Sequence, residues 1–159
     1  MPSETKVTFN IVGLERVQQN TNNKKAGRVG VIGNKALRKH SNGLTNAQVG
    51  ATHEDGSYSQ NKPRRSFLKD PITDAKPRMT AKIKEIALKY LSVPNGLDII
   101  LKQLGLLGEV VVQEAFDTGN HGKWQPLSPV TIKKKGHDTE LIETAELSQS
   151  VSSDVVNIK

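Results

Sequence analysis

Apolar residues recur about every 3.6 positions in two long segments in the middle of the chain, a spacing typical of amphipathic helices. The first segment ends at Pro94-Asn95-Gly96, and its apolar positions are Met79, Ile83, Ile86, Ala87 and Tyr90. The second ends near Gly119, a residue suited to the left-handed position after a helix. Its apolar positions are Leu97, Ile100, Leu101, Leu104, Leu107, Val111, Val112 and Ala115. These two segments predict the main helices of the fold.

Prolines and glycines modify both predicted helices. Asp70 followed by Pro71 is a typical helix start, so the first helix can begin there. Pro77 is expected to kink this helix or to delay its regular part, because proline has no backbone N–H. In the second helix, Gly105 and Gly108 each lower the helix propensity by up to about 1 kcal/mol. Close packing of these glycines against the first helix or a sheet would explain their presence.

Period-two patterns predict β-strands near both ends of the chain. Residues 6–12 alternate between polar and apolar, and β-branched residues return at 28–32. The Asn-rich segment 13–25 between them favours turns, so the sequence predicts a hairpin with a long, mobile tip. The valines and isoleucine of residues 151–158 allow a final strand.

Short helices and polar loops are expected in the rest of the chain. Residues 57–62 are polar and turn-forming, which predicts an exposed loop. Three short helical segments are bounded by capping or turn residues: Thr45 or Asn46 to Asp55-Gly56, Ser128-Pro129 to Gly136, and one turn within residues 141–150. The elements together predict an α+β fold, with a small antiparallel sheet packed against two main amphipathic helices and long polar loops. We expect a single domain over residues 1–159.

Composition limits the size of the core and the surroundings of the protein. Of the 159 residues, 35% are hydrophobic and 4% aromatic, so the core is expected to be modest and mainly aliphatic. The absence of cysteine excludes disulfides and thiolate chemistry. No run approaches the roughly 18–20 apolar residues that span a bilayer, and the first residues lack the apolar region of a signal peptide. We therefore expect a soluble protein without an export signal or membrane contact.

Residue patterns for catalysis or metal binding are missing. The histidines are scattered and lack the spacing of a metal site: His40, His53, His121 and His137. His53-Glu54-Asp55 could hold a cation, but consecutive residues of a helix point in different directions. The glycines of residues 27–33 do not form a phosphate-binding loop, and serines such as Ser148 and Ser150 lack a strand-turn-helix elbow or an adjacent base. The sequence predicts that the chain is not an enzyme and has no catalytic residues, cofactor or metal.

Charge makes nucleic-acid binding the alternative function. The net charge is +7, and basic residues gather at 24–39 and 62–69, whereas acidic residues gather at 140–154. This asymmetry suits either a polyanion or a head-to-tail contact between copies of the chain. Only Tyr58 and Phe67 lie among the basic residues, so a platform for base stacking is missing. A basic nucleic-acid-binding module is thus the second interpretation.

An ordered series of residue blocks resembles the tail-completion and virion-morphogenesis proteins of tailed bacteriophages. Residues 46–56, followed by Pro63-Arg64-Arg65-Ser66-Phe67-Leu68, resemble that family's segment of helix, His-Glu-x-Gly, loop and Arg-x-Phe-Leu. Phe116-Asp117-Thr118-Gly119 and the stretches 124–132 and 141–151 resemble its later blocks, including W-x-P-L-S-x-x-T and L-I-x-T-G-x-L-x-x-S. The resemblance covers about residues 44–156, with Ala145 where the family usually has Gly.

This resemblance implies an α+β subunit that assembles without catalysis. The family forms a ring, expected to be a hexamer, between the head-completion or connector proteins and the tail terminator or tail tube. The implied location is the neck of the virion, after assembly in the host cytoplasm. Genomic DNA would pass through the channel of the ring, with non-specific contact to the protein.

The candidate interface residues come from these blocks: Arg64, Arg65, Phe67, Leu68, Trp124, Pro126 and Leu127. In one interpretation, the apolar members close the core. In the other, part of Trp124 or Phe67 lies at a contact between subunits, where aromatics and arginines are typical anchors. The polar segments 13–25 and 55–62 are expected to be disordered in the free subunit and to become ordered between neighbouring copies.

Overall fold

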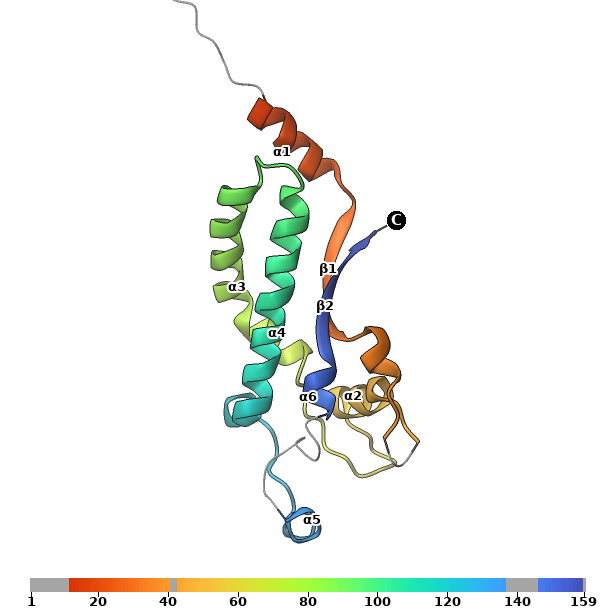
Figure 1. Cartoon of the computed structure of the whole chain (residues 1–159). Helices are drawn as coiled ribbons and strands as arrows, with labels where there is room; N and C mark the ends of the chain where they lie inside the picture. Colours follow the sequence, from red (N-terminus) through yellow and green to blue (C-terminus); the bar gives the residue numbers. More distant parts are fainter. Residues whose placement is uncertain (1–11, 41–42, 137–145, 159) are drawn as a thin grey trace, which may run out of the picture.

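The fold is known from a computed structural model, which describes residues 12–40, 43–136 and 146–158. Figure 1 shows an elongated molecule with α1 at one end and α5 at the other. The elements in chain order are α1 (Val12–Asn22), β1 (Lys25–Val31), the 3-10 helix η1 (Gly33–Leu37), α2 (Asn46–Asp55), α3 (Lys69–Tyr90), α4 (Gly96–Gly122), α5 (Pro129–Lys135), α6 (Glu146–Ser150) and β2 (Val151–Asn157).

Helix α4 is the central element of the fold. It packs against α3 on one side and against both strands on another, so that it separates α3 from the sheet (Figure 1). The two strands are antiparallel. The predicted fold class is confirmed: the protein is α+β, with a small antiparallel sheet packed against helices.

Glycines in α4 allow the sheet to approach the helix closely. A Cβ atom at Gly105 would lie 2.6 Å from Ser153 Oγ, and one at Gly108 would lie 3.1 Å from Val29 Cγ1. Both glycines therefore face the strands, which confirms the packing expected for them. The loss of helix propensity is offset by close contact between α4 and the sheet, which larger side chains at these two positions would prevent.

The sheet joins two segments that are far apart in the sequence. β1 pairs with β2 in an unbroken register, from Lys25 opposite Asn157 to Val31 opposite Val151. The predicted final strand is thus confirmed. The predicted hairpin is wrong for the described residues, because the partner of β1 there is β2. The strand expected at residues 6–11 lies outside the described residues.

The segment predicted to be a mobile hairpin tip is a helix. Residues 12–22 form α1, and Asn20 anchors it with a side chain that is only 4% exposed. The Asn20 amide donates to the carbonyl oxygens of Leu91 and Val93 at 2.7 and 3.1 Å and accepts from the Leu97 N–H at 3.3 Å. Asparagine favours turns as a local preference, but here its side chain replaces backbone partners in the turn between α3 and α4. Disorder of residues 13–25 is therefore not supported.

Helix ends agree with the predicted capping residues at three places. Thr45 accepts from Gln48 N–H, and Gln48 accepts from Thr45 N–H, which completes a capping box at the start of α2. Ser128 caps α5 by accepting from the Thr131 N–H at 3.3 Å. At the far end of α4, Gly119 has φ 59°, so the right-handed helix ends where the sequence predicts.

Helix α3 begins two residues earlier than predicted and continues through Pro77. Its first residue is Lys69, which leaves Asp70 and Pro71 in the first turn, where a missing N–H costs little. The helix changes direction in its first half (Figure 1), as expected for a kink at an internal proline. Pro77 thus kinks the helix and does not delay it.

The close approach of α4 to the sheet can be tested with Gly105→Ala. Alanine favours a helix, but its Cβ would lie 2.7 Å from Ser153 Cβ, an atom that cannot rotate away. We expect the free energy of unfolding in urea to fall by about 1–3 kcal/mol, as for other overpacked sites.

Gly13→Ala in α1 is the matched control, because no atom lies within 4 Å of the added Cβ. This control should raise stability by about 0.4–1 kcal/mol. A stabilising effect of Gly105→Ala would show that the glycine is not required by the packing.

Candidate interface around the start of α3

Three aromatic side chains form the centre of the core. The rings of Phe67 and Phe116 are 5.1 Å apart, and the ring of Trp124 meets Phe116 edge-on at 5.9 Å. All three are at most 6% exposed. They pack with Val112, Ala115 and Leu147, so this cluster joins α4, α6 and the loops before α3 and α5.

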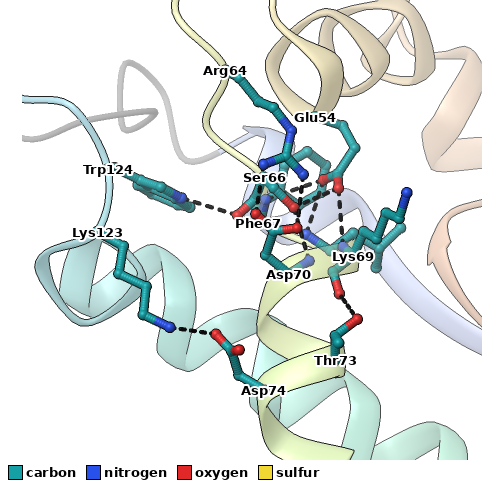
Figure 2. Close-up of polar contacts among 11 residues, drawn as sticks. Glu54, Arg64, Ser66, Phe67, Lys69, Asp70, Thr73, Asp74, Lys123 and Trp124 are labelled. Carbon is teal, nitrogen blue, oxygen red and sulfur yellow. Dashed lines mark hydrogen bonds and ion pairs between the residues drawn. The ribbon is translucent and has the colours of Figure 1, made fainter.

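Polar contacts fix the loop before α3 to the loop after α4. The Trp124 indole N–H donates to the Ser66 carbonyl oxygen at 2.9 Å (Figure 2). The Arg65 guanidinium, which is also buried, donates to the Gln125 carbonyl oxygen at 2.6 and 3.0 Å and to that of Pro126 at 3.4 Å. Through these bonds, Arg65 holds the backbone of the loop after α4.

The carboxylate of Glu54 organises the start of α3. It accepts the Ser66 hydroxyl at 2.6 Å and three backbone N–H groups, those of Phe67, Leu68 and Lys69, at 3.1, 3.0 and 3.0 Å (Figure 2). The first N–H groups of a helix have no partner within the helix, and Leu68 at the N-cap provides no side-chain acceptor. Glu54 supplies that acceptor from the end of α2.

Surface ion pairs surround this centre. Arg64 forms a bidentate pair with Asp70 at 2.6 and 2.7 Å, and Lys123 pairs with Asp74 at 2.5 Å (Figure 2). The hydrogen bond from Arg64 lowers the pKa of the Asp70 carboxyl below its usual value and raises the pKa of the guanidinium. These pairs lie at the rim, where water screens them.

The seven candidate residues from the sequence gather at this one region. Arg65, Phe67 and Trp124 are buried, Leu68 and Leu127 are half-buried, and Arg64 and Pro126 are exposed. Burial of Phe67 and Trp124 within the chain agrees with the interpretation that they close the core. The residues left for contact with another molecule are the outward-facing Arg64, Pro126 and Leu127.

An open groove lies beside these outward-facing residues, at the α5 end of the molecule. Its volume is about 650 Å³, and its walls include Pro126, Leu127 and the turn at residues 57–62. This turn is closed by two backbone hydrogen bonds of 2.9 Å between Ser57 and Lys62, and Tyr58 is fully exposed on it. The exposed loop expected at residues 57–62 is thus confirmed, whereas its ordering between copies stays a prediction.

A second apolar groove lies at the opposite end, between α1 and the last turns of α3. Its volume is about 490 Å³, and it is lined by Val17, Lys84, Ala87, Leu88, Leu91 and Ser92. Leu88 is 89% exposed and Leu14 on α1 is 68% exposed. The sequence did not indicate this surface, because it arises only when α1, predicted to be a loop, brings apolar residues beside α3.

Several charged side chains that could bind a metal ion or a polyanion already have partners within the chain. Among residues 12–40, 43–136 and 146–158, no three His, Asp or Glu side chains form a cluster that could hold a metal ion. Glu54 already accepts from four donors, which fills the acceptor positions that a cation would use. Five of the ten clustered basic residues are held within the chain: Lys25, Arg28, Lys35, Arg64 and Arg65.

Comparison with protein-family models, curated proteins and solved structures found no match to this chain. No described helix is long and apolar enough to cross a membrane.

Glu54→Gln tests the role of this carboxylate at the start of α3. Glutamine has nearly the same shape but offers one acceptor oxygen and turns an NH2 group toward backbone donors. Hydrogen bonds to charged groups contribute about 1.5–3 kcal/mol each, so we expect a loss of at least about 1.5 kcal/mol in the free energy of unfolding in urea.

The matched control is Glu85→Gln, since Glu85 forms only an exposed pair with Lys82 on the surface of α3. This control should change the unfolding free energy by less than about 0.5 kcal/mol. Equal effects of the two substitutions would contradict the organising role of Glu54.

Acid should weaken the fold through three surface carboxylates that form ion pairs with arginines. The pKa values of Asp70, Glu114 and Asp154 are lowered in the folded state by hydrogen bonds from Arg64, Arg78 and Arg28. Their stabilisation is therefore complete above the unfolded pKa values of about 4 and is lost as the pH falls through the lower folded values. We expect the thermal midpoint to be flat from pH 7 to 5 and to fall below about pH 4.

Asp70→Asn should make that decline shallower, because it removes one of the titrating groups. Asp117→Asn is the control, since the Asp117 carboxylate accepts from the Gln113 side chain and not from a cation. A decline of the same steepness in wild type and Asp70→Asn would exclude a contribution from Asp70.

Proposed function

We propose that this chain is a structural subunit of the head-to-tail joint of a tailed bacteriophage, of the tail-completion type. In this proposal copies of the chain form a ring, expected to be a hexamer, in the neck of the virion. The ring links head-completion or connector proteins to the tail terminator or tail tube. It has no catalytic role and no cofactor, and it assembles in the host cytoplasm.

One observation carries the proposal: the residue blocks that resemble the family meet in a single cluster. Glu54 of the first block binds the backbone of Phe67 in the second, and Trp124 of a later block donates to Ser66. Leu147 of the last block packs in the same core. Blocks separated by tens of residues thus form one structural unit, as a shared fold signature requires.

The surface of the subunit also suits a joint. A joint must bind different neighbours at its two ends, and the molecule has an exposed apolar feature at each end. The groove beside Leu88 lies at the α1 end, and Tyr58 projects beside the groove at the α5 end. Exposed apolar surface of this kind is typical of protein contacts. Passage of DNA needs weak contact, which agrees with the ion pairs that Lys25, Arg28 and Arg64 form within the chain.

Assembly and DNA binding by the purified chain separate this proposal from a nucleic-acid-binding module. We expect mass photometry to show a closed ring of uniform copy number, with a central channel in negative-stain images. Titration with a labelled duplex should show weak binding at physiological salt. A DNA-binding module would instead bind as a monomer, with a log–log salt slope of about −0.9 for each phosphate contact.

The two results overturn different parts of the proposal. A monomer at all accessible concentrations that binds duplex DNA with nanomolar affinity would exclude the ring and favour the alternative. In a phage that encodes this chain, loss of the chain should leave heads and tails unjoined, and normal joined particles would contradict the assigned place in the virion.

A further inference from the structure

Among the described residues, the two-stranded sheet has no further strand at either edge, and the hydrogen-bonding pattern of the edges follows from one contact. The Ile158 N–H donates to the Lys24 carbonyl oxygen at 2.9 Å, one pair beyond the strands. Bonded and non-bonded pairs alternate along an antiparallel ladder, so residues 26, 28 and 30 face β2 with their backbone groups. The N–H and C=O groups of residues 27, 29 and 31 of β1, and of 151, 153 and 155 of β2, point outward.

These outward groups have no hydrogen-bond partner among the described residues. Neither strand contains proline, and no bulge interrupts the register of the two strands. The single lysine, Lys25, lies at the end of β1 and is held by Asp98 at 2.8 Å. Natural proteins usually protect such edges with proline, bulges or lysine, so unprotected edges indicate a partner strand.

The charges of Arg28 and Asp154 indicate which edge of a second copy each strand can pair with. Arg28 is the central residue of β1 and Asp154 is the central residue of β2, and both point to the face opposite α4. They pair at 2.6 Å within the chain, yet their side chains are still 53% and 42% exposed. If the β1 strands of two copies paired along their full length, two Arg28 side chains would lie opposite each other. Pairing of two β2 strands would oppose two Asp154 side chains in the same way.

Only pairing between unlike edges avoids this repulsion. When β1 of one copy lies beside β2 of the next, Arg28 lies opposite the neighbour's Asp154, and opposite charges directly across strands are favourable. Strand directions also alternate in this arrangement, so the new pair is antiparallel like the pair within the chain. Each copy then gives one edge and receives another, a head-to-tail contact that can close into a ring.

We propose that copies of this chain join by sheet extension, with the outer edge of β1 from one copy pairing with the outer edge of β2 from the next. The inference rests on the proposed ring and names the contact that forms it. Along the open face, arginine and aspartate would alternate from copy to copy around the assembly.

Disulfide trapping tests this contact directly, because the chain has no cysteine. Two single-cysteine variants, Arg28→Cys and Asp154→Cys, have no partner thiol within their own chain. They are mixed, allowed to exchange subunits and oxidised. We expect a cross-linked pair of chains in the mixture and none when either variant is oxidised alone. Ser152→Cys and Val156→Cys replace Asp154→Cys in parallel mixtures, so that a shift of two residues in register is also detected.

Val155→Pro provides a second measurement that does not depend on cross-linking. It removes an outward N–H that the chain itself does not use, and it keeps a side chain of similar size. We expect association at each interface to weaken about tenfold, the effect of one lost hydrogen bond of about 1.4 kcal/mol. The thermal midpoint of the monomer should change little.

The outcomes distinguish this contact from the proposed function. A ring without a cross-link in any of the mixtures, or with cross-links in the separate Arg28→Cys sample, would overturn sheet extension and leave the ring proposal standing. A chain that stays monomeric and forms no cross-link would overturn both. A cross-link in the mixture from a chain that plays no part in a phage joint would support the contact and reject the assigned function.

Discussion

The fold depends on the carboxylate of Glu54, which lies in α2 but binds the backbone at the start of α3. Leu68, the N-cap residue of α3, has no side-chain acceptor. The Ser66 hydroxyl accepts from the Asp70 N–H, and Glu54 at the end of α2 accepts from the N–H groups of Phe67, Leu68 and Lys69. This contact fixes the direction in which α3 leaves the loop, and it therefore fixes the position of Phe67 in the core. Ser66, held by the same carboxylate, presents its carbonyl oxygen to the Trp124 indole. Helix, core and the loop after α4 are thus positioned by one group of hydrogen bonds.

Local patterns in the sequence predicted the elements that local forces determine. Each of these elements depends on residues within a few positions of each other. They are the helical stripes, the capping box at Thr45, the cap at Ser128 and the helix end at Gly119. The candidate site was found for a different reason, since the residue blocks were matched as a series. Their burial was not evident, because spacing alone cannot separate an aromatic anchor from a core residue.

Contacts between distant segments decided what the sequence could not predict. Asn20 lies in a segment with turn-forming composition, and its partners are backbone groups more than 70 positions away. The partner of β1 is likewise distant, because Arg28 and Asp154 are 126 positions apart. The role of Glu54 was also missed, since a carboxylate at the end of one helix gives no local sign that it will cap the next. Such pairings add to the fold only after the intervening chain has folded.

The pairing of β1 with β2 has a consequence for synthesis. The ribosome makes β1 before all the helices from α2 to α6 and makes β2 after them, so β1 has no partner strand while these helices are synthesised. A truncated chain lacks both the strand that completes its sheet and the edge that would accept a neighbour. If copies join as proposed, only a chain that contains both strands presents both edges, so a product that ends before β2 would be kept out of the assembly by the order of translation alone.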